Sequence, residues 1–96
     1  MTSKQRAYLK SLASVLEPTF QLGKSSVTPE FTNAIIENFN THELVKINVL
    51  KNCLEDPKTV AVTIAERTNS QLVQVIGRKI VLFKRNKDNP KIILPK

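Results

Sequence analysis

A change of hydrophobic period along the chain constrains the fold more than any other feature of the sequence. Residues 44–50 alternate, with Val45, Ile47 and Val49 on one side and polar residues between them, as in a half-buried β-strand. Apolar residues three and four positions apart, the spacing of a buried helix face, occur before and after this segment. A strand between two helices favours an α/β domain, because strand–helix–strand units place their helices against a sheet.

The same criteria predict three helices and four strands in one domain, since 96 residues leave no room for a second hydrophobic core. The expected helices cover residues 3–16, 29–41 and 57–68, and the expected strands cover residues 19–22, 44–50, 72–76 and 80–83. We therefore predict a two-layer α/β sandwich of order α-β-α-β-α-β-β, with a mixed four-stranded sheet, over residues 1–84. Residues 85–96 are predicted to form a basic, mobile tail, although Ile92 to Leu94 could instead dock on the sheet.

The segment between the first strand and the second helix has the composition of an anion-binding loop. A small-residue turn, Gly23–Ser26, carries Lys24 and is followed by Thr28 as the expected N-cap and Pro29 at the first helical position. Free backbone N–H groups and the positive end of the helix dipole would face this turn, and Lys24 would add a full charge. The sequence therefore predicts a site for a phosphate or another anion here.

Nucleotide hydrolysis does not fit this loop. Gly23, Lys24 and Ser25 end like a Walker A motif, but that motif needs a glycine five residues before Gly23, where this chain has Pro18. No apolar strand ends in an aspartate suited to a magnesium ligand, so no enzymatic activity and no cofactor are expected. Phosphate-backbone contact without hydrolysis remains, as in the G-x-x-G loop of KH modules.

Soft ligands and nucleophiles are scarce. Cys53 is the only cysteine, which excludes an internal disulfide, and with the single histidine, His42, it supplies too few ligands for a structural zinc site. We expect Cys53 to be a small buried residue near a strand end, and His42 to lie at a helix terminus rather than to act as a base. No metal site is predicted.

The charge balance points to a polyanionic partner. Fifteen Lys and Arg against eight Asp and Glu give a formal charge of +7 and a pI near 9.9. Two alternatives stay open at this stage: the lysines could only solvate helix faces, or a basic helix could lie on a membrane. No apolar run approaches the ~20 residues of a membrane span, and no secretory signal is recognised, so a cytoplasmic location is expected.

Basic residues outside the loop could converge with it on one RNA. Aromatic platforms for base stacking are few, since only Tyr8 and Phe83 fall outside the patterns of core residues, so electrostatic and shape-based binding of structured RNA is expected. The predicted RNA-contacting residues are Gly23, Lys24, Ser25, Ser26, Lys46, Lys51, Arg78, Lys79 and Lys84, with Lys4, Arg6 and Lys10 as an extension along the first helix.

Several strings between residues 2 and 84 carry a family resemblance. They are Thr2-Ser3-Lys4-Gln5-Arg6-Ala7-Tyr8-Leu9-Lys10, Gln21-Leu22-Gly23-Lys24, Val27-Thr28-Pro29-Glu30-Phe31, Glu43-Leu44-Val45-Lys46, Val49-Leu50-Lys51-Asn52-Cys53 and Val75-Ile76-Gly77-Arg78-Lys79-Ile80-Val81-Leu82. In this order they resemble the bacterial stand-alone CRM domain, the YhbY-like RNA-binding proteins. The resemblance implies a fold similar to the C-terminal domain of translation initiation factor three, with the last strand antiparallel to the others.

The family's G-x-x-G loop maps onto residues 23–26, where Ser25 and Ser26 stand in place of glycine. If position 26 needs a positive φ, serine is strained there in a way that glycine is not. Alternatively, the hydroxyl groups of Ser25 and Ser26 donate to phosphate.

The resemblance also implies a function. Bacterial members look like assembly factors of the large ribosomal subunit, and plant relatives carry the domain in organellar intron-splicing factors. We therefore expect a monomeric RNA-binding protein that contacts ribosomal RNA on large-subunit precursors in the cytoplasm. The alternative is a protein–protein adaptor that docks on a ribosomal protein through its sheet or through Ile92 to Leu94, without direct RNA recognition.

Overall fold

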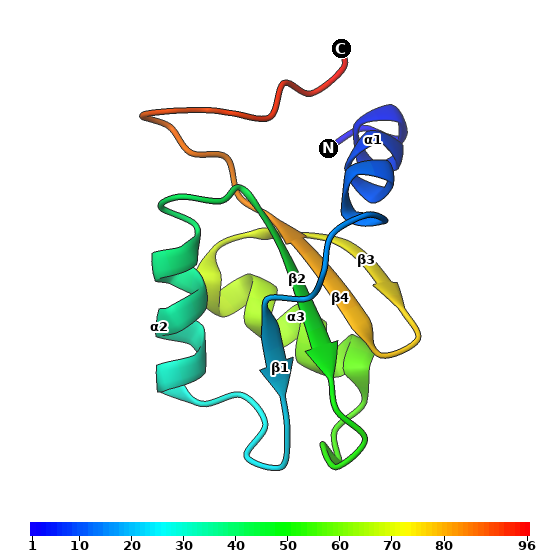
Figure 1. The fold of residues 1–96 in the computed structure, drawn as a ribbon, viewed down its shortest axis with the longest axis vertical. Coiled ribbons are helices and arrows are strands. Elements are labelled where there is room, and N and C mark those ends of the chain that lie inside the picture. Colours follow the sequence, from blue (N-terminus) through cyan, green and yellow to red (C-terminus); the bar gives the residue numbers. More distant parts are fainter.

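The computed structural model, which describes all 96 residues, contains the predicted three helices and four strands in the predicted order (Figure 1). The elements are α1 (Ser3–Ala13), β1 (Phe20–Leu22), α2 (Pro29–Asn38), β2 (Leu44–Val49), α3 (Pro57–Thr68), β3 (Gln71–Ile76) and β4 (Lys79–Phe83). The first two helices end three residues earlier than the sequence pattern predicted, because the chain leaves each helix through tight turns. As a consequence Leu16, which lies at helical spacing from the buried Leu9 and Ala13 and within the helix predicted for residues 3–16, is 40% exposed.

Side-chain caps set where two of the helices begin. At α1 the Thr2 hydroxyl accepts a hydrogen bond from the Gln5 N–H at 3.1 Å, and the Gln5 side chain accepts one from the Thr2 N–H at 3.0 Å. At α2 the Thr28 hydroxyl accepts from the Phe31 N–H at 3.1 Å, which confirms Thr28 as the cap. At α3 the residue before the first turn, Asp56, forms no such bond.

The four strands form one mixed sheet in the order β1-β2-β4-β3. Strand β1 is parallel to β2, and β4 is antiparallel to both of its neighbours, as predicted. The register places Phe20 opposite Ile47 and Ile47 opposite Ile80, so apolar side chains of three strands share one face. The predicted fold class is thereby confirmed.

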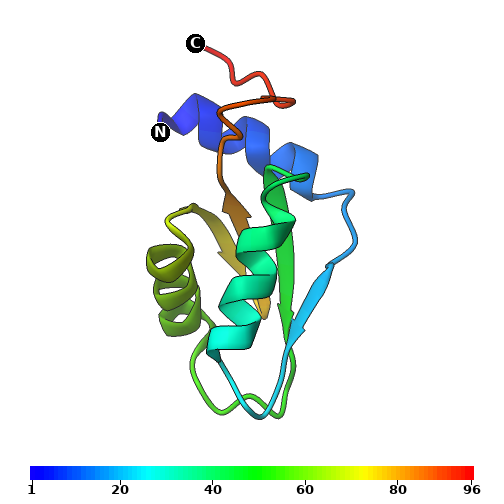
Figure 2. The same cartoon turned by 90° about the vertical axis from the view of Figure 1, so that its left-hand side faces the viewer.

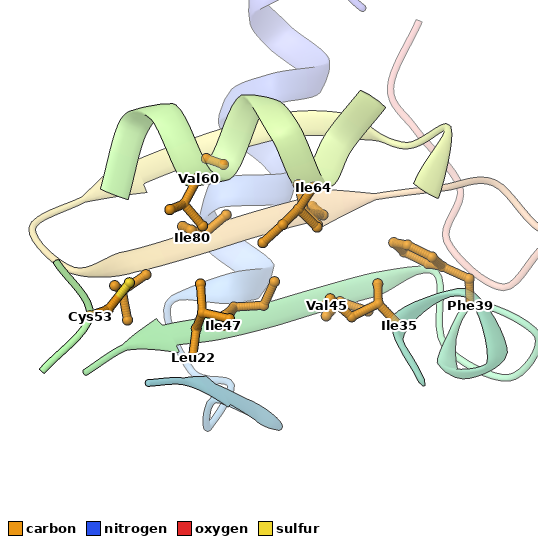
Figure 3. Close-up of a cluster of buried hydrophobic side chains, with 12 residues drawn as sticks. Leu22, Ile35, Phe39, Val45, Ile47, Cys53, Val60, Ile64 and Ile80 are labelled. Atoms are coloured by element: carbon orange, nitrogen blue, oxygen red, sulfur yellow. The ribbon is translucent and has the colours of Figure 1, made fainter. Parts of the chain in front are cut away.

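The main core lies between this face of the sheet and the helices α2 and α3. Figure 3 shows Val60 and Ile64 of α3 directed at the strands, where Ile47 and Ile80 lie, and all four side chains are fully buried. The remaining buried members of the cluster are Leu22, Ile35, Phe39, Val45, Val49, Cys53, Ala61 and Leu82. Burying one such aliphatic side chain contributes ~1.5–3 kcal/mol, so this cluster supplies most of the folding free energy.

Helix α1 packs on the opposite face of the sheet, where it adds a partial third layer to the predicted sandwich. Leu9 and Ala13 of α1 form a second buried cluster with Val73, Val81 and Phe83. Phe83 is only 4% exposed, so it belongs to the core and is not the stacking platform that the sequence suggested. Figures 1 and 2 both place α1 at one end of the sheet, so the strands beyond it are not covered on this side.

Residues 85–96, predicted to be a mobile tail, contain no helix or strand but lie next to α1 (Figure 2). The carboxylate of Glu43, which is 4% exposed, accepts hydrogen bonds from the backbone N–H groups of Asn86, Lys91 and Ile92 at 2.7–2.8 Å. Ile92 and Leu94 pack against the second cluster. A single buried carboxylate thus holds both ends of the segment's turn.

We expect acid to release this segment. Burial would raise the pKa of Glu43, but the three N–H donors and the charge of Arg85 outweigh it, and the pKa lies below its ordinary value of 4.5. A lowered pKa means that the carboxylate stabilises the docked segment above the pKa of the unfolded chain, and that this stabilisation is lost as the pH falls through the lowered value. The backbone NMR signals of Lys91 and Ile92 should therefore move to random-coil chemical shifts in acid.

The Glu43→Gln variant separates this effect from general acid unfolding. Its tail signals should already be disordered at neutral pH, because a neutral amide is a weaker acceptor and brings its own N–H donors towards the backbone donors. The Glu37→Gln variant, altered on the exposed surface of α2, is the control and should behave like wild type. Wild-type tail signals in Glu43→Gln would contradict the assignment.

Candidate nucleic-acid interface

Two loops lie side by side at one end of the sheet. Strands β1 and β2 are parallel, so the loops that follow them, residues 23–28 and 50–56, leave the sheet at the same end (Figure 1). The Leu50 N–H donates to the Leu22 carbonyl at 2.8 Å, and a Cβ atom on Gly23 would lie 3.4 Å from the side-chain oxygen of Asn52. Backbone and side chains of the two loops are therefore in contact.

The first loop is a tight turn that leads into α2. The Ser26 N–H donates to the Gly23 carbonyl at 3.0 Å, so Lys24 and Ser25 occupy the centre of the turn, and both are exposed. Two residues later Thr28 caps α2, whose positive dipole end faces this end of the sheet. The arrangement predicted for an anion-binding loop is present, with exposed Lys24 beside a helix N-terminus.

Ser26 has the positive φ that a glycine usually provides at this position of a G-x-x-G loop. Its φ is +55°, in the left-handed region that favours glycine, and a side chain there costs roughly 1–2 kcal/mol. Its hydroxyl donates to the carboxylate of Glu55, so it is not a free donor for phosphate. Ser25 alone keeps an unoccupied hydroxyl, and of the two interpretations of these serines the strained one describes Ser26.

An acidic residue that sequence reasoning did not select lies at this loop. Glu55 is exposed and reaches Ser26 from the second loop, 29 residues along the chain. No local pattern links the two residues; only the parallel pairing of β1 with β2 brings them together. Its carboxylate places a negative charge at the turn where the sequence predicted an anion site.

Arg78 at the tip of the β3–β4 hairpin is bound to the end of β2. Its guanidinium donates from Nε to the Val49 carbonyl at 2.9 Å and from Nη2 to the Leu50 carbonyl at 2.8 Å. The chain reverses through Gly77, whose φ is +58°, and this places Arg78 next to the second loop. The positively charged guanidinium of Arg78 lies at the loop end of the sheet, but its hydrogen bonds serve first to hold the hairpin to β2.

Three other predicted contact residues use their charges to bind carbonyl oxygens of the protein. The Lys46 ammonium donates to the Ala13 and Leu16 carbonyls at the end of α1, at 3.0 and 3.1 Å. Lys84 donates to the Thr68 carbonyl at the end of α3, at 3.0 Å. Cations at helix C-termini satisfy unpaired carbonyls and interact favourably with the negative end of the helix dipole.

The third of these residues, Arg6, donates from Nη1 to the carbonyls of Leu72 and Val73 in β3. Lys4 and Lys10 are exposed on the same helix, α1.

The structure thus divides the predicted residues into two groups. Those at the loop end of the sheet are Gly23, Lys24, Ser25, Ser26, Lys51, Arg78 and Lys79. Lys84 follows β4 and lies at the opposite end, while Lys4, Arg6 and Lys10 belong to α1, which Figure 1 also shows at that opposite end. Lys46 of β2 belongs with this second group, because its ammonium binds carbonyls at the end of α1. The predicted convergence therefore holds for the loop and its immediate neighbours only.

Lys58 joins the loop-end residues although the sequence analysis did not select it. It is exposed in the first turn of α3, directly after the second loop. A cation in the first turn is repelled by the positive end of the helix dipole, so this lysine does not stabilise the helix. Its position after the second loop is the signal that could have identified it.

Other chemistry is sparse in the structure. No group of three or more His, Cys, Asp or Glu side chains is placed to hold a metal ion, and no helix is long and apolar enough to cross a bilayer. Cys53 is buried, with its sulfur 3.9 Å from the Ser26 hydroxyl, as expected for a structural residue. His42 is exposed after α2, where its Nδ1 lies 2.9 Å from the Thr41 hydroxyl.

Removing the Arg78 side chain should destabilise the fold. Hydrogen bonds made by a charged donor contribute ~1.5–3 kcal/mol each, and Arg78 makes two, but its side chain is only half-buried and water screens part of this contribution. Arg78→Ala should therefore lower the free energy of unfolding by about 2–4 kcal/mol in urea titrations. The matched variant Lys79→Ala changes an exposed neighbour that makes no such bond, and it should leave the stability nearly unchanged. Equal stability of the two variants would contradict the structural role of Arg78.

Comparison with known proteins gives consistent matches along the whole chain. The model of the CRS1 / YhbY (CRM) domain family matches residues 1–84. The chain is 44% identical over 95 residues to "Probable RNA-binding protein YqeI" of Bacillus subtilis, covering 99% of both chains. It is 37% identical over 97 residues to an "RNA-binding protein" of Haemophilus influenzae, covering 100% of this chain and 96% of the other. The solution structure of a hypothetical protein from Staphylococcus aureus matches with a TM-score of 0.83 and 42% identity, over 99% of both chains.

Proposed function

The chain belongs to the CRS1 / YhbY (CRM) domain family, and we propose that it is an RNA-binding protein that holds the RNA backbone at the loop end of its sheet. Relatives that cover nearly its whole length carry the name RNA-binding protein, which supports RNA as the partner. We propose no catalytic activity for it.

One observation carries the proposal: lysines from two adjacent loops lie exposed around a turn whose backbone and helix terminus favour an anion. Lys24 comes from the first loop and Lys51 from the second, and neither ammonium group is used within the protein. Lys79 extends the positive surface along the hairpin. Phosphate groups match this arrangement because they accept from both ammonium and backbone N–H donors.

The expected binding is electrostatic and therefore depends on salt. Contact of three lysines with phosphates of a single strand releases condensed counterions and gives a slope of log K against log salt of roughly −2. A duplex contact by the same residues gives a slope of about −3. Binding that does not change with salt would rule out this mode.

We further propose that the RNA is ribosomal RNA in precursors of the large subunit, and that the protein acts there as a monomer in the cytoplasm. The family resemblance of residues 2–84 supports this target, and the net charge of +7 suits a partner as acidic as a ribosomal particle. In a sucrose gradient of lysate from cells that make the chain, the protein should sediment with large-subunit precursors. Ribonuclease treatment before the gradient should release it to the top.

A protein–protein adaptor is the second candidate, and one feature favours it. A hollow of about 420 Å³ lies between the end of α1 and the tail, with Val15 (83% exposed), Leu16 and Ile92 among its apolar lining. Sedimentation with ribosomal particles that survives ribonuclease would support the adaptor and contradict the RNA-binding proposal.

A further inference from the structure

The face of the sheet that carries α1 is open beyond that helix, and most of its residues are polar. Directly paired residues on neighbouring strands point to the same face, and one such row crosses the sheet as Gln21, Asn48, Lys79 and Ile76. The row covers three interstrand steps of ~4.8 Å, about 14 Å in all. We call this row, together with Lys46 and Gln74 of the next row, the open sheet face.

The open sheet face offers hydrogen-bonding groups that the protein does not use. Gln21 is exposed, Asn48 and Gln74 are half-buried, and none of their three side-chain amides bonds to another part of the chain. Each amide combines two N–H donors with an acceptor oxygen, the pattern that pairs with edges of nucleic-acid bases. Three such groups on one rigid sheet form a surface that can discriminate between bases.

The helix and the strands that form this face carry charge of a single sign. No Asp or Glu occurs in α1 or in any of the four strands, and all eight acids lie on α2, on α3 or in connecting segments and the tail. Lys46 and Lys79 belong to the face, and Lys10 of α1 borders it. The phosphates of an RNA strand on this face therefore meet no acidic side chain of these elements.

A hollow continues the face under the edge of α1. It measures about 250 Å³, and Lys10, Lys46, Gln74 and Ile76 are among the residues that line it. Its polar groups and its Lys10 ammonium suit a nucleotide better than an apolar side chain. Ile76, 60% exposed at the rim, offers an apolar surface against which a base can lie.

The open sheet face is continuous with the phosphate-binding loop. Gln21 lies two residues before Gly23, and Lys79 directly follows Arg78 at the hairpin tip. An RNA strand whose backbone is held by Lys24 can therefore extend across the sheet over Gln21 of β1 and Asn48 of β2.

We propose that the open sheet face binds unpaired nucleotides of the same RNA and reads their base edges through the amides of Gln21, Asn48 and Gln74. The inference rests on the proposed function, since the loop must first hold the backbone. It adds base discrimination to an otherwise sequence-independent electrostatic contact.

The test compares short fluorescein-labelled homopolymers of A, C, G and U by anisotropy. Wild-type protein should bind its preferred homopolymer about fivefold or more tightly than the least preferred, the discrimination expected of one or two base-edge contacts. The double variant Gln21→Ala, Asn48→Thr, which leaves only Gln74 of the three amides, should bind all four within about twofold. Its salt slope should equal that of wild type, because no charge has changed. The control Asn33→Ala alters an exposed amide on α2, across the sheet, and should keep the preference.

The outcomes distinguish this inference from the proposed function. A wild type without preference, or a double variant that keeps it, overturns base reading while RNA binding itself stands. If wild-type protein binds none of the four homopolymers and does not bind a hairpin RNA either, the proposed function is contradicted. In NMR titrations the side-chain amide signals of Gln21 and Asn48 should shift with the preferred RNA. Loop shifts without these signals would overturn the inference and leave the face to a protein partner.

Discussion

The double charge reversal Lys24→Glu, Lys51→Glu should lower RNA affinity by about 30- to 900-fold at low salt. An ammonium and a phosphate in contact attract by ~1 kcal/mol in water, and a carboxylate in the same place repels by a similar amount, so each reversal changes binding by about 1–2 kcal/mol after screening. Both lysines are exposed and make no contact that the fold requires, so stability in urea should be unchanged. The measurement is anisotropy of a short labelled RNA hairpin over a range of salt concentrations.

The control for this variant carries the same change of net charge at the other end of the molecule. Lys87→Glu, Lys96→Glu alters two exposed lysines of the tail, which lies beside α1 and away from the two loops (Figure 1). Its affinity should fall by less than about fivefold, since only long-range attraction is lost across more than a Debye length. Equal losses in the two variants would show that net charge, and not the loop lysines, determines binding.

The Glu55→Gln substitution should tighten RNA binding by about three- to tenfold, because it removes a negative charge from the position that phosphate approaches. Glutamine can still accept the hydrogen bond from the Ser26 hydroxyl, so the loop should keep its shape. Affinity and salt slope measured with the same hairpin check this expectation. The control Glu66→Gln, on the exposed surface of α3, should leave the affinity unchanged.

A second substitution asks whether the strained serine also limits binding. Ser26→Gly removes the strain of a side chain at positive φ and also removes the hydrogen bond to Glu55, so it should tighten RNA binding too. Its effect should not add fully to that of Glu55→Gln, because both changes remove the same contact. Weaker binding in Glu55→Gln would show that the carboxylate organises the loop for RNA.

Local signals made much of the fold predictable. Thr28 and Pro29 mark the start of α2 within a few residues of sequence, and the structure has the helix there. The alternation of Val45, Ile47 and Val49 identified both β2 and its buried face. These features depend on backbone geometry and burial, which neighbouring residues determine.

The site was less predictable because its contacts connect distant parts of the chain. Lys46 and Lys84 looked free in the sequence, yet each binds the carbonyl end of a helix, 30–33 and 16 residues away respectively. Glu55 reaches Ser26 across 29 residues. A lysine's partner is set by tertiary packing, so a count of charges could indicate an acidic ligand without showing which charges remain available.

The same reason applies to α1 and the tail. The helical pattern of residues 3–16 identified a buried stripe but not the face of the sheet that it covers. Glu43 precedes β2 and had no recognisable role in the sequence, whereas in the structure it binds three backbone N–H groups of residues 86–92.

The location of RNA on this protein can be measured directly by following backbone amide signals in a nitrogen–proton NMR titration with an RNA hairpin. Binding at the loop end of the sheet predicts that the largest shifts fall in residues 23–28 and 50–56, with smaller ones at Arg78 and Lys79, and that added salt reverses them. Shifts centred on the exposed surfaces of α2 and α3 or on residues 85–96, with both loops unchanged, would contradict it.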